Sequence, residues 1–167
     1  LVALGQLGAD AVGLDVDTKA VAATQLRANG YQTQVRAEVG TASEMSFSTN
    51  EFDIVVSFDV LEHVPDKLAM LHETVRVLRP GGILMLSAPN RFGLKLLAGD
   101  PHYNRMGITP LPGSVARWWV TEFRGEIEYD VETLPTRSWT ERQLIRRGIQ
   151  LLPAPGESLP PQGLRGL

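Results

Sequence analysis

Two apolar runs separated by one helix length give the clearest pattern in this chain. Residues 52–58 (FDIVVSF) and 83–88 (ILMLSA) are apolar and partly β-branched, which is typical of strands buried in a sheet. Pro65 and Asp66 open the intervening helix, and the PGG sequence at 80–82 ends it. The apolar residues of that helix recur at the spacing of one face: Leu68, Leu71, Val75 and Leu78. The segment therefore predicts two parallel, neighbouring strands joined by a helix.

The first fifty residues continue this alternation of strands and helices. An apolar run at 11–14 that ends in Asp15 indicates a strand, and a weaker strand is expected at 32–39. Asp17 can cap the helix between them, at 18–29. The helix at 18–29 is expected to stop at Gly30 and to have an apolar side that includes Val21 and Leu26. Residues 1–7 are expected to be the end of an earlier helix stopped by Gly8, and residues 41–50 a polar connection. The alternation predicts an α/β, doubly wound fold with a mostly parallel sheet.

The pattern changes after residue 90. Residues 100–113 are rich in Pro and Gly, and a loop of that length is typical of a functional segment or a cap. Later expectations are a helix at 115–123, a strand at 126–131, and a helix opened by a capping box of Ser138 and Glu141 and ended by Gly148. We therefore expect a single domain over 1–150, with 91–136 as a cap or insertion and 151–167 as a Pro/Gly-rich tail.

Polar residues follow both central strands. Asp59, Glu62 and His63 come after the first strand, and Asn90 follows the second. The carboxyl ends of neighbouring parallel strands open on one crevice, where ligands bind in sheets of this kind. These four residues are therefore the first candidates for a functional site.

Composition narrows the possible functions. The chain has 167 residues, a net charge of −3 and no basic run, so nothing favours binding to nucleic acid. No apolar run approaches the ~20 residues of a membrane-spanning helix, and no signal peptide is visible. The chain contains no cysteine, which excludes disulfides and Cys nucleophiles and is compatible with a cytoplasmic protein. The oligomeric state is left open.

In order and spacing, three motifs resemble those of class I S-adenosylmethionine-dependent methyltransferases, especially the group that includes the ubiquinone- and menaquinone-pathway enzymes. The motifs are GADAVGLDVD, EFDIVVSFDVLEHVPD and VLRPGGILMLSAPN, which lie between Leu1 and about Asn90. The resemblance implies a Rossmann-like sheet. It also implies that the family's first strand and glycine-rich cofactor loop would precede Leu1, so that the chain is truncated at its N-terminus.

The resemblance implies a set of residues for binding S-adenosylmethionine. Asp15 would accept hydrogen bonds from the ribose hydroxyls, and Val16 would pack against adenine. Thr41 and Ala42 would line the adenine pocket, although relatives often carry an acidic residue near this point. Phe58 completes the cofactor set. The alternative is that Asp15 is a turn residue and that Thr41 belongs to an ordinary loop.

A divalent cation is a second implication. Asp59, Glu62, His63 and Asn90 offer the oxygen and imidazole ligands that suit Mg²⁺ or Mn²⁺, and the resembling ubiquinone-pathway enzymes are described as using a metal at the matching positions. The alternative is that Leu61–Val64 is a packing motif whose polar side chains bond locally.

Histidines provide the candidates for a general base. His63 has the best position to take a proton from a hydroxyl group, and His102, with Tyr103, is the second candidate. His72 is expected to be exposed or locally bonded. Trp118, Trp119 and Phe123 could line a substrate pocket, but such a cluster is more often part of the core or the underside of a cap.

The resemblance implies methyl transfer to a small-molecule acceptor, and His63 and the candidate metal ligands favour oxygen as the acceptor atom. Two alternatives stay open at this point. A nicotinamide-dependent oxidoreductase would also place an acid after its second strand to bind ribose. A chain without the glycine-rich loop could instead be a noncatalytic or binding-incompetent methyltransferase-like fragment.

Overall fold

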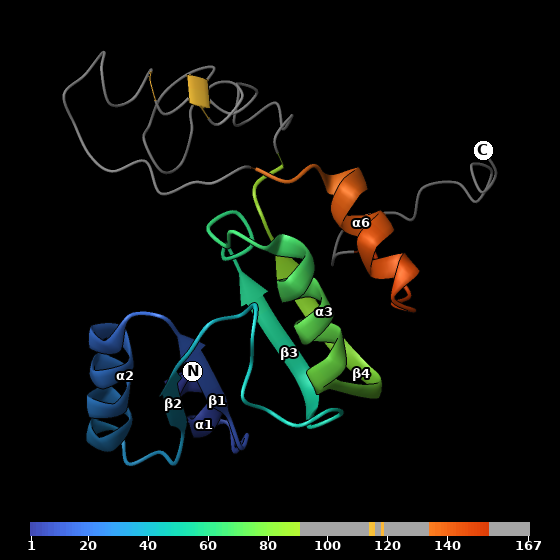
Figure 1. The fold of residues 1–167 in the computed structure, drawn as a ribbon. Helices are drawn as coiled ribbons and strands as arrows, with labels where there is room; N and C mark the ends of the chain where they lie inside the picture. Colours follow the sequence, from blue (N-terminus) through green and yellow to red (C-terminus); the bar gives the residue numbers. More distant parts are fainter. Residues whose placement is uncertain (91–113, 116–117, 119–133, 154–167) are drawn as a thin grey trace.

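The computed structural model describes residues 1–90, 114–115, 118 and 134–153 (Figure 1). The predicted helix at 115–123 and strand at 126–131 fall largely or wholly outside them, as does most of the tail. The elements in chain order are α1 (Val2–Gln6), β1 (Val12–Asp15), α2 (Thr18–Gly30), β2 (Arg36–Val39), β3 (Phe52–Phe58), α3 (Lys67–Val77), β4 (Leu78–Ser87) and α6 (Arg137–Arg146).

The strands form two parallel pairs. Strand β1 pairs with β2, with Val12 opposite Arg36, and β3 pairs with β4, with Val55 opposite Leu84. The predicted parallel arrangement of β3 and β4 is therefore confirmed, and so is the α/β fold class. Among the described residues, no strand joins the two pairs into one sheet (Figure 1). We call α1, β1, α2 and β2 the first half, and β3, α3, β4 and α6 the second half.

The larger core lies in the second half, between the β3–β4 pair and helices α3 and α6. Its fully packed members are Leu61, Val64, Met70, Leu71 and Leu144. Leu84 and Leu86 of β4 pack against this cluster from the sheet. The core therefore fixes the residues that directly follow β3, because Leu61 and Val64 belong to it.

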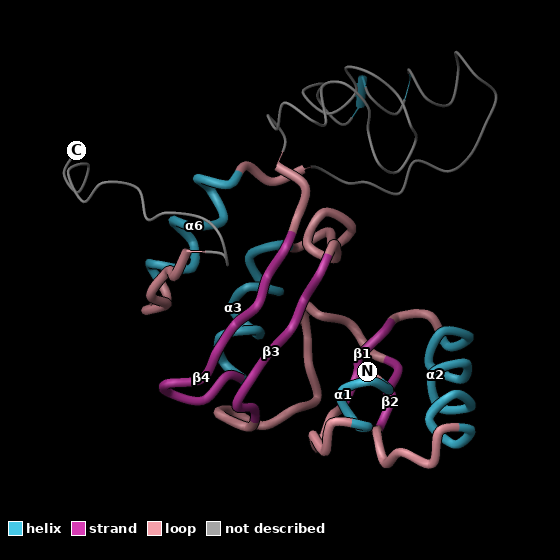
Figure 2. Tube along the Cα trace, turned by 180° about the vertical axis from the view of Figure 1, so that it is seen from behind, coloured by secondary structure: helices cyan, strands magenta, loops and turns pink. Residues whose placement is uncertain are grey.

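Strand β3 was expected to be buried on both faces, and this prediction is wrong for the described residues. Ile54, Val56 and Phe58 are 54%, 44% and 53% exposed, and their neighbours Ile83 and Met85 on β4 are exposed as well. These side chains point away from α3 and α6, because successive residues of a strand face opposite sides of the sheet. Figure 2 shows the β3–β4 pair from this side, where no described helix covers it.

Helix α3 begins as predicted. Asp66 is its N-cap, and the side chain accepts a hydrogen bond from the Ala69 N–H at 2.9 Å. The buried stripe of the helix is Met70, Leu71, Thr74 and Val77, whereas Leu68 is 47% exposed. Leu68 was expected in the core, but at 100° per residue it lies outside that stripe, beyond Leu71.

The turn after α3 depends on two glycines. Gly81 has φ of +79°, a conformation that side chains other than glycine rarely adopt. A Cβ atom on Gly82 would lie 2.8 Å from the Asp53 carbonyl oxygen, so this position requires close approach of the two strands. Strand β4 consequently starts earlier than predicted, at Leu78 rather than at residue 83, with a register irregularity at the turn.

The first half has a small core of Ala11, Ala28 and Val35. Asp17 caps α2 as predicted, because its side chain accepts from the Lys19 N–H at 2.8 Å. Gly8 has φ of +86° after α1, in agreement with its predicted role as a stop. Leu26 was expected on the apolar side of α2 but is 75% exposed, since Ala28 is the residue of this helix that the core buries.

Helix α6 begins two residues earlier than predicted. The N-cap is Thr136, whose side chain accepts from the Trp139 N–H at 3.2 Å, so the expected cap at Ser138 is wrong. Glu141 bonds to Arg137 at 2.7 Å instead of closing a capping box with Ser138. Gly148, with φ of +84°, follows the helix as expected.

Candidate functional site

Asp15 lies at the carboxyl end of β1 with its side chain exposed. One carboxylate oxygen accepts from the Asp17 N–H at 2.9 Å, and the Asp15 carbonyl accepts from the Gly40 N–H at 2.9 Å. The first bond fits the alternative of a turn residue, but it uses only one oxygen of an exposed carboxylate. Val16 is 72% exposed beside it. The pair therefore presents an acceptor and an apolar surface at the same strand end.

Thr41 and Ala42 follow β2, the strand that pairs with β1. Thr41 is exposed, and its hydroxyl accepts from the Ser43 N–H at 3.3 Å. Ala42 packs against the larger core of the second half. Because β1 and β2 are parallel neighbours, Asp15 and Thr41 lie at the same end of this strand pair.

Asp59 directly follows β3 in a left-handed backbone conformation, with φ of +53°. Its N–H donates to the Ser87 carbonyl at 3.1 Å, and the Ser87 hydroxyl donates to its carboxylate at 3.1 Å. Non-glycine residues with positive φ are uncommon and are held in place by their surroundings. Here the two contacts with Ser87 tie the carboxyl ends of β3 and β4 together.

Glu62 and His63 lie in the turn between β3 and α3. The Glu62 side chain is fully buried, and the His63 side chain is 31% exposed. The His63 Nε2 atom lies 4.0 Å from Glu62 Oε1, which is an ion-pair distance when the imidazole is protonated. Leu61 and Val64, on either side, belong to the core. The segment thus combines the packing role of the alternative interpretation with one imidazole that solvent reaches.

The predicted metal ligands do not gather into one cluster. Within residues 1–90 and the other described positions, no group of three or more His, Asp or Glu side chains lies close enough to hold a metal ion. Asn90 accepts from the Arg137 N–H at 3.2 Å, so its amide oxygen is engaged by the start of α6. Asp59 is bonded to Ser87. The residues in this arrangement do not fit a metal centre, and we derive no chemistry from one.

Two residues of α3 fix the connection that carries Thr41 and Ala42. The Arg76 guanidinium donates to the Met45 carbonyl at 3.1 Å and to the Phe47 carbonyl at 2.8 Å. It also forms two bonds to the Glu73 carboxylate, at 2.6 and 2.7 Å. Glu73 in turn accepts from the Met45 N–H at 2.9 Å. The pKa of Glu73 is lowered from 4.5 to about 2. The hydrogen bonds from Arg76 are the largest cause and the bond from the Met45 N–H is a smaller one, whereas burial acts in the opposite direction.

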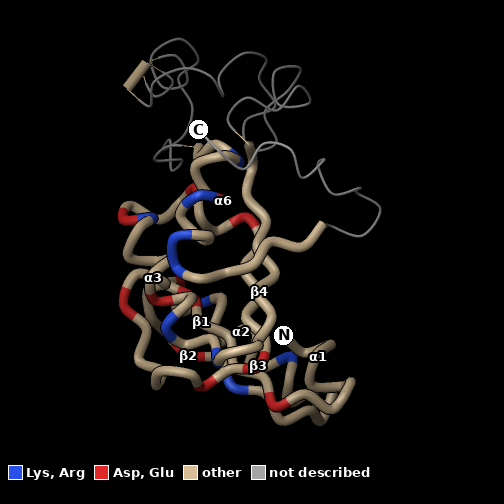
Figure 3. The backbone as a smooth tube through the Cα atoms, turned by 90° about the vertical axis from the view of Figure 1, so that its right-hand side faces the viewer, with Lys and Arg blue, Asp and Glu red and all other residues tan. Residues whose placement is uncertain are grey.

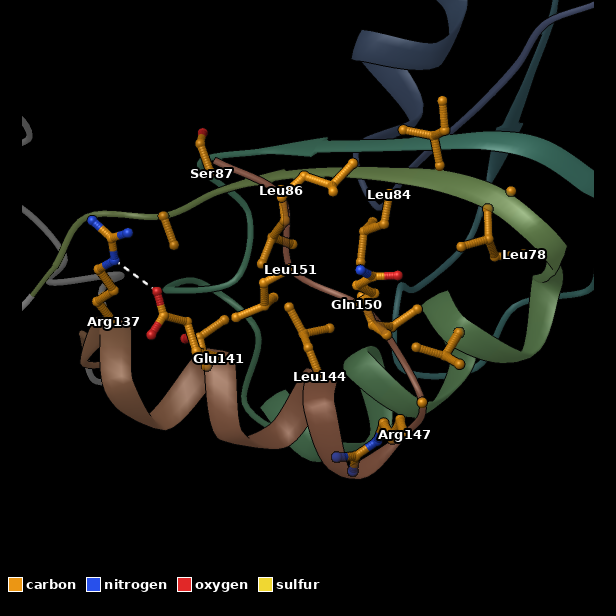
Figure 4. Close-up of a pocket in the computed structure, with 18 of the residues that line it drawn as sticks. Leu78, Leu84, Leu86, Ser87, Arg137, Glu141, Leu144, Arg147, Gln150 and Leu151 are labelled. Atoms are coloured by element: carbon orange, nitrogen blue, oxygen red, sulfur yellow. Dashed lines mark hydrogen bonds and ion pairs between the residues drawn. The ribbon is translucent and has the colours of Figure 1, made fainter. Parts of the chain in front are cut away.

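A cavity among the described residues lies elsewhere. It has a volume of about 1080 Å³ and lies between β4, α6 and residues 149–152 (Figure 4). Leu84, Leu86, Leu144 and Leu151 line its apolar part, as the close-up shows. Neither Asp15 nor Thr41 lines it, so it is not the predicted cofactor site. His102, the second candidate base, lies outside the described residues.

Charges of both signs are interspersed along the described backbone (Figure 3). Among the described residues, no helix has the length and apolar character needed to cross a membrane. Exposed pairs such as Arg36–Glu38, at 3.6 Å, contribute little to the free energy of folding.

Comparison with known proteins distinguishes a methyltransferase from a nicotinamide-dependent oxidoreductase. The profile of the family described as "Methyltransferase domain" matches residues 1–86. The chain belongs to this family. The predicted class I methyltransferase resemblance is thereby confirmed, and it is favoured over the alternative of a nicotinamide-dependent oxidoreductase.

Curated relatives of this methyltransferase domain include two enzymes named ubiquinone biosynthesis O-methyltransferase. The protein from Azorhizobium caulinodans is 33% identical over 119 residues, which cover 69% of this chain and 45% of the relative. The protein from Cereibacter sphaeroides is 33% identical over 88 residues, which cover 53% of this chain and 36% of the relative. The chain thus spans less than half the length of either relative.

The solved structure of the YcgJ protein from Bacillus subtilis supports the fold. It superimposes with a TM-score of 0.56 at 20% identity and covers 83% of this chain and 51% of that protein. At this identity the similarity concerns the fold alone.

Sequence reasoning missed Ser87, Glu73 and Arg76. Ser87 is the last residue of β4, so its contact with Asp59 follows only from the observed strand register. Glu73 and Arg76 are three residues apart on one helix, a spacing that predicts an ion pair. Their bonds to residues 45 and 47, about thirty positions earlier, have no signal in the sequence.

Proposed function

We propose that the complete protein transfers the methyl group of S-adenosylmethionine to an oxygen atom of a small molecule. Membership of the methyltransferase domain family, with a match that ends in β4, is the observation that carries this proposal. The choice of oxygen is supported by the O-methyltransferase names of the two relatives and by the partly exposed imidazole of His63.

The adenosine part of the cofactor is proposed to bind at the carboxyl ends of β1 and β2. Asp15 would accept hydrogen bonds from the ribose hydroxyls, while Val16 and Ala42 would offer apolar contacts to adenine. Thr41 would offer a hydroxyl to the adenine edge, and Phe58 an exposed ring at the end of β3. When bound, the cofactor supplies an electrophilic methyl group on a sulfonium.

His63 is the proposed general base. Its imidazole would take the proton from the acceptor hydroxyl as that oxygen forms its bond to the methyl carbon. Bound S-adenosylmethionine would supply the methyl group with its carbon–sulfur electron pair leaving on sulfur, which balances this proton transfer. The Glu62 carboxylate, 4.0 Å from Nε2, would stabilise the imidazolium that results.

Residues 91–136 are proposed to cover the acceptor, with His102 as a second group able to accept a proton. This assignment rests on their place in the chain, directly after β4, whose carboxyl end carries Ser87. Segments that follow the strands of such sheets commonly set specificity.

The test is a methyl-transfer screen of the full-length protein against phenols, quinols, carboxylic acids and amines, together with calorimetric titration of S-adenosylhomocysteine and NAD. We expect binding of S-adenosylhomocysteine, no binding of NAD and methylation of a hydroxyl-bearing acceptor. Binding of S-adenosylhomocysteine without transfer to any acceptor would favour a noncatalytic binding protein. Binding of neither nucleotide would refute the proposal.

His63→Gln separates chemistry from cofactor binding. We expect the variant to bind S-adenosylhomocysteine as the wild type does and to lose about 10²- to 10⁴-fold in kcat, the usual contribution of a general base. His72→Gln is the matched control, because that imidazole is 70% exposed on α3. Equal kcat in both variants would remove His63 from the mechanism.

A further inference from the structure

The connection between β2 and β3 is held from one side by helix α3. Residues 41–50 form no helix or extended strand, apart from an isolated bridge between Thr41 and Glu44. Backbone groups of Met45 and Phe47 bond to the side chains of Glu73 and Arg76. The Arg76 carbonyl also accepts from the Asn50 N–H at 2.9 Å. Three points of this connection are therefore anchored to one turn of α3.

The anchor is partly shielded from solvent. The Glu73 side chain is 14% exposed and that of Arg76 24% exposed. The guanidinium forms paired bonds to the carboxylate, which is the strong, geometrically specific form of this interaction. Two further N–H groups of the guanidinium are directed to two backbone carbonyls. This arrangement uses the planar fork of arginine, which a lysine ammonium cannot reproduce.

We propose that Glu73 and Arg76 are positioning residues for the adenine side of the cofactor site, because their side chains hold Met45 and Phe47 and thereby fix Thr41 and Ala42 beside the end of β1. This inference rests on the proposed function. The path from anchor to site is short, since Met45 lies three residues after Ala42. Ser43 adds a weaker contact to the Asp66 carbonyl at 3.5 Å, at the start of the same helix.

The physical basis is preorganisation. A polar connection without regular structure loses conformational entropy when a ligand orders it. If the connection holds its binding conformation for only a tenth of the time, the apparent affinity falls about tenfold. Anchoring to α3 removes this cost before the cofactor arrives. Neither residue touches the cofactor in this proposal, so the acceptor and the chemical step should be unaffected.

The test measures binding of S-adenosylhomocysteine and steady-state kinetics for Arg76→Ala, Arg76→Lys and Glu73→Gln in the full-length protein. We expect the dissociation constant of S-adenosylhomocysteine and the KM for S-adenosylmethionine to rise about tenfold in Arg76→Ala, with a smaller rise in the other two variants. The acceptor KM and kcat at saturating cofactor should change less than about twofold. Arg36→Ala, which breaks an exposed pair on β2, is the matched control and should leave every constant unchanged.

Hydrogen exchange gives a local readout. The Met45 amide, whose acceptor is the Glu73 carboxylate, should exchange faster in all three variants and at the wild-type rate in Arg36→Ala. If Arg76→Ala does not fold, the comparison rests on Arg76→Lys and Glu73→Gln. Folded variants that bind S-adenosylhomocysteine as tightly as the wild type would overturn the inference while leaving the proposed function intact. A rise in the acceptor KM equal to that for the cofactor would also overturn it, because the effect would then be general. A wild-type protein that binds no S-adenosylhomocysteine would instead defeat the proposed function itself.

Discussion

Among single residues, Asp15 has the clearest link between place and proposed chemistry. Asp15 is the last residue of β1, and its carboxylate is exposed. One carboxylate oxygen accepts a local hydrogen bond from the Asp17 N–H. Carboxylates that accept from ligand hydroxyls make hydrogen bonds worth roughly 1.5–3 kcal/mol, because one partner is charged. Removing the side chain should therefore weaken cofactor binding without altering the reacting groups.

We accordingly expect Asp15→Ala to raise the KM for S-adenosylmethionine by about 10- to 100-fold, with a smaller change in kcat. Calorimetric titration with S-adenosylhomocysteine would measure the same loss directly. Asp10→Ala removes an exposed carboxylate five positions earlier and serves as the control for net charge. An Asp15→Ala protein with the wild-type KM would leave Asp15 with only its turn contact to Asp17.

The candidate site could be predicted only residue by residue. The sequence order GLDVD identifies Asp15 because a strand-ending acid is a local pattern. The predicted metal ligands do not come together among the described residues, and the reason is different. Asp59, Glu62 and Asn90 all follow the two neighbouring strands β3 and β4. However, Glu62 is buried, Asp59 bonds to Ser87, and Asn90 bonds to Arg137, so their side chains do not converge. Side-chain direction depends on packing that spacing does not encode.

At the scale of elements, helix starts show how local signals compete. Thr136 and Ser138 are both good caps by residue type, and the sequence pattern favoured Ser138 because Glu141 follows three positions later. The structure places the cap at Thr136, and Glu141 bonds to Arg137 within the helix. Boundaries are thus harder to predict than the existence of a helix, since one turn offers several competing polar residues.

This assignment makes a direct comparison possible. Thr136→Ala should lower the free energy of unfolding by about 1 kcal/mol, because the Trp139 N–H loses its acceptor. Ser138 is exposed in the first turn of α6, so Ser138→Ala should change the free energy of unfolding by less than about 0.5 kcal/mol. Urea unfolding monitored by circular dichroism would measure both. A larger effect at Ser138 than at Thr136 would restore the capping box.

The anchoring of residues 41–50 to α3 should also appear in the pH dependence of stability. The pKa of Glu73 is lowered from 4.5 to about 2 in the folded protein, mainly by its hydrogen bonds from Arg76. The folded state therefore binds the proton less readily than the unfolded state. The resulting stabilisation is fully present above pH 4.5 and is lost as the pH falls from there toward about 2.

We expect the melting temperature of the wild type to fall more steeply than that of Glu73→Gln as the pH is lowered from about 5 to about 3, because the variant has no carboxylate to protonate at this position. Differential scanning calorimetry at several pH values would measure the two slopes. Glu38→Gln, in the exposed pair with Arg36, is the control and should follow the wild type. Parallel curves for the wild type and Glu73→Gln would show that Glu73 contributes nothing to acid sensitivity.

At the scale of the whole molecule, the described residues divide into halves of unequal packing. The first half buries Ala11, Ala28 and Val35, all small side chains. The second half buries a larger cluster that includes Leu61, Met70 and Leu71. The sequence predicted the alternation of elements, because hydrophobic periodicity is a local signal. The parallel pairing of the strands then followed from this alternation. The sequence did not predict the separation of β1–β2 from β3–β4 or the exposure of Val56, because both depend on which strands and helices lie beside them.

Unequal packing predicts unequal local stability. In the full-length protein without cofactor, amides of β1 and β2 should exchange with solvent faster than those of β3 and β4, because less apolar surface is buried around them. S-adenosylhomocysteine should reduce this difference in exchange rate. Two of its proposed contacts, Asp15 and Thr41, lie at the ends of β1 and β2, so the ligand should stabilise the first half, whereas Phe58 lies in the second half. Hydrogen exchange followed by mass spectrometry, with and without the nucleotide, would measure both effects. NAD at the same concentration is the control and should protect neither half. Equal exchange in the two halves without ligand would contradict the structural division, whereas protection of the second half alone would move the proposed adenosine site away from β1 and β2.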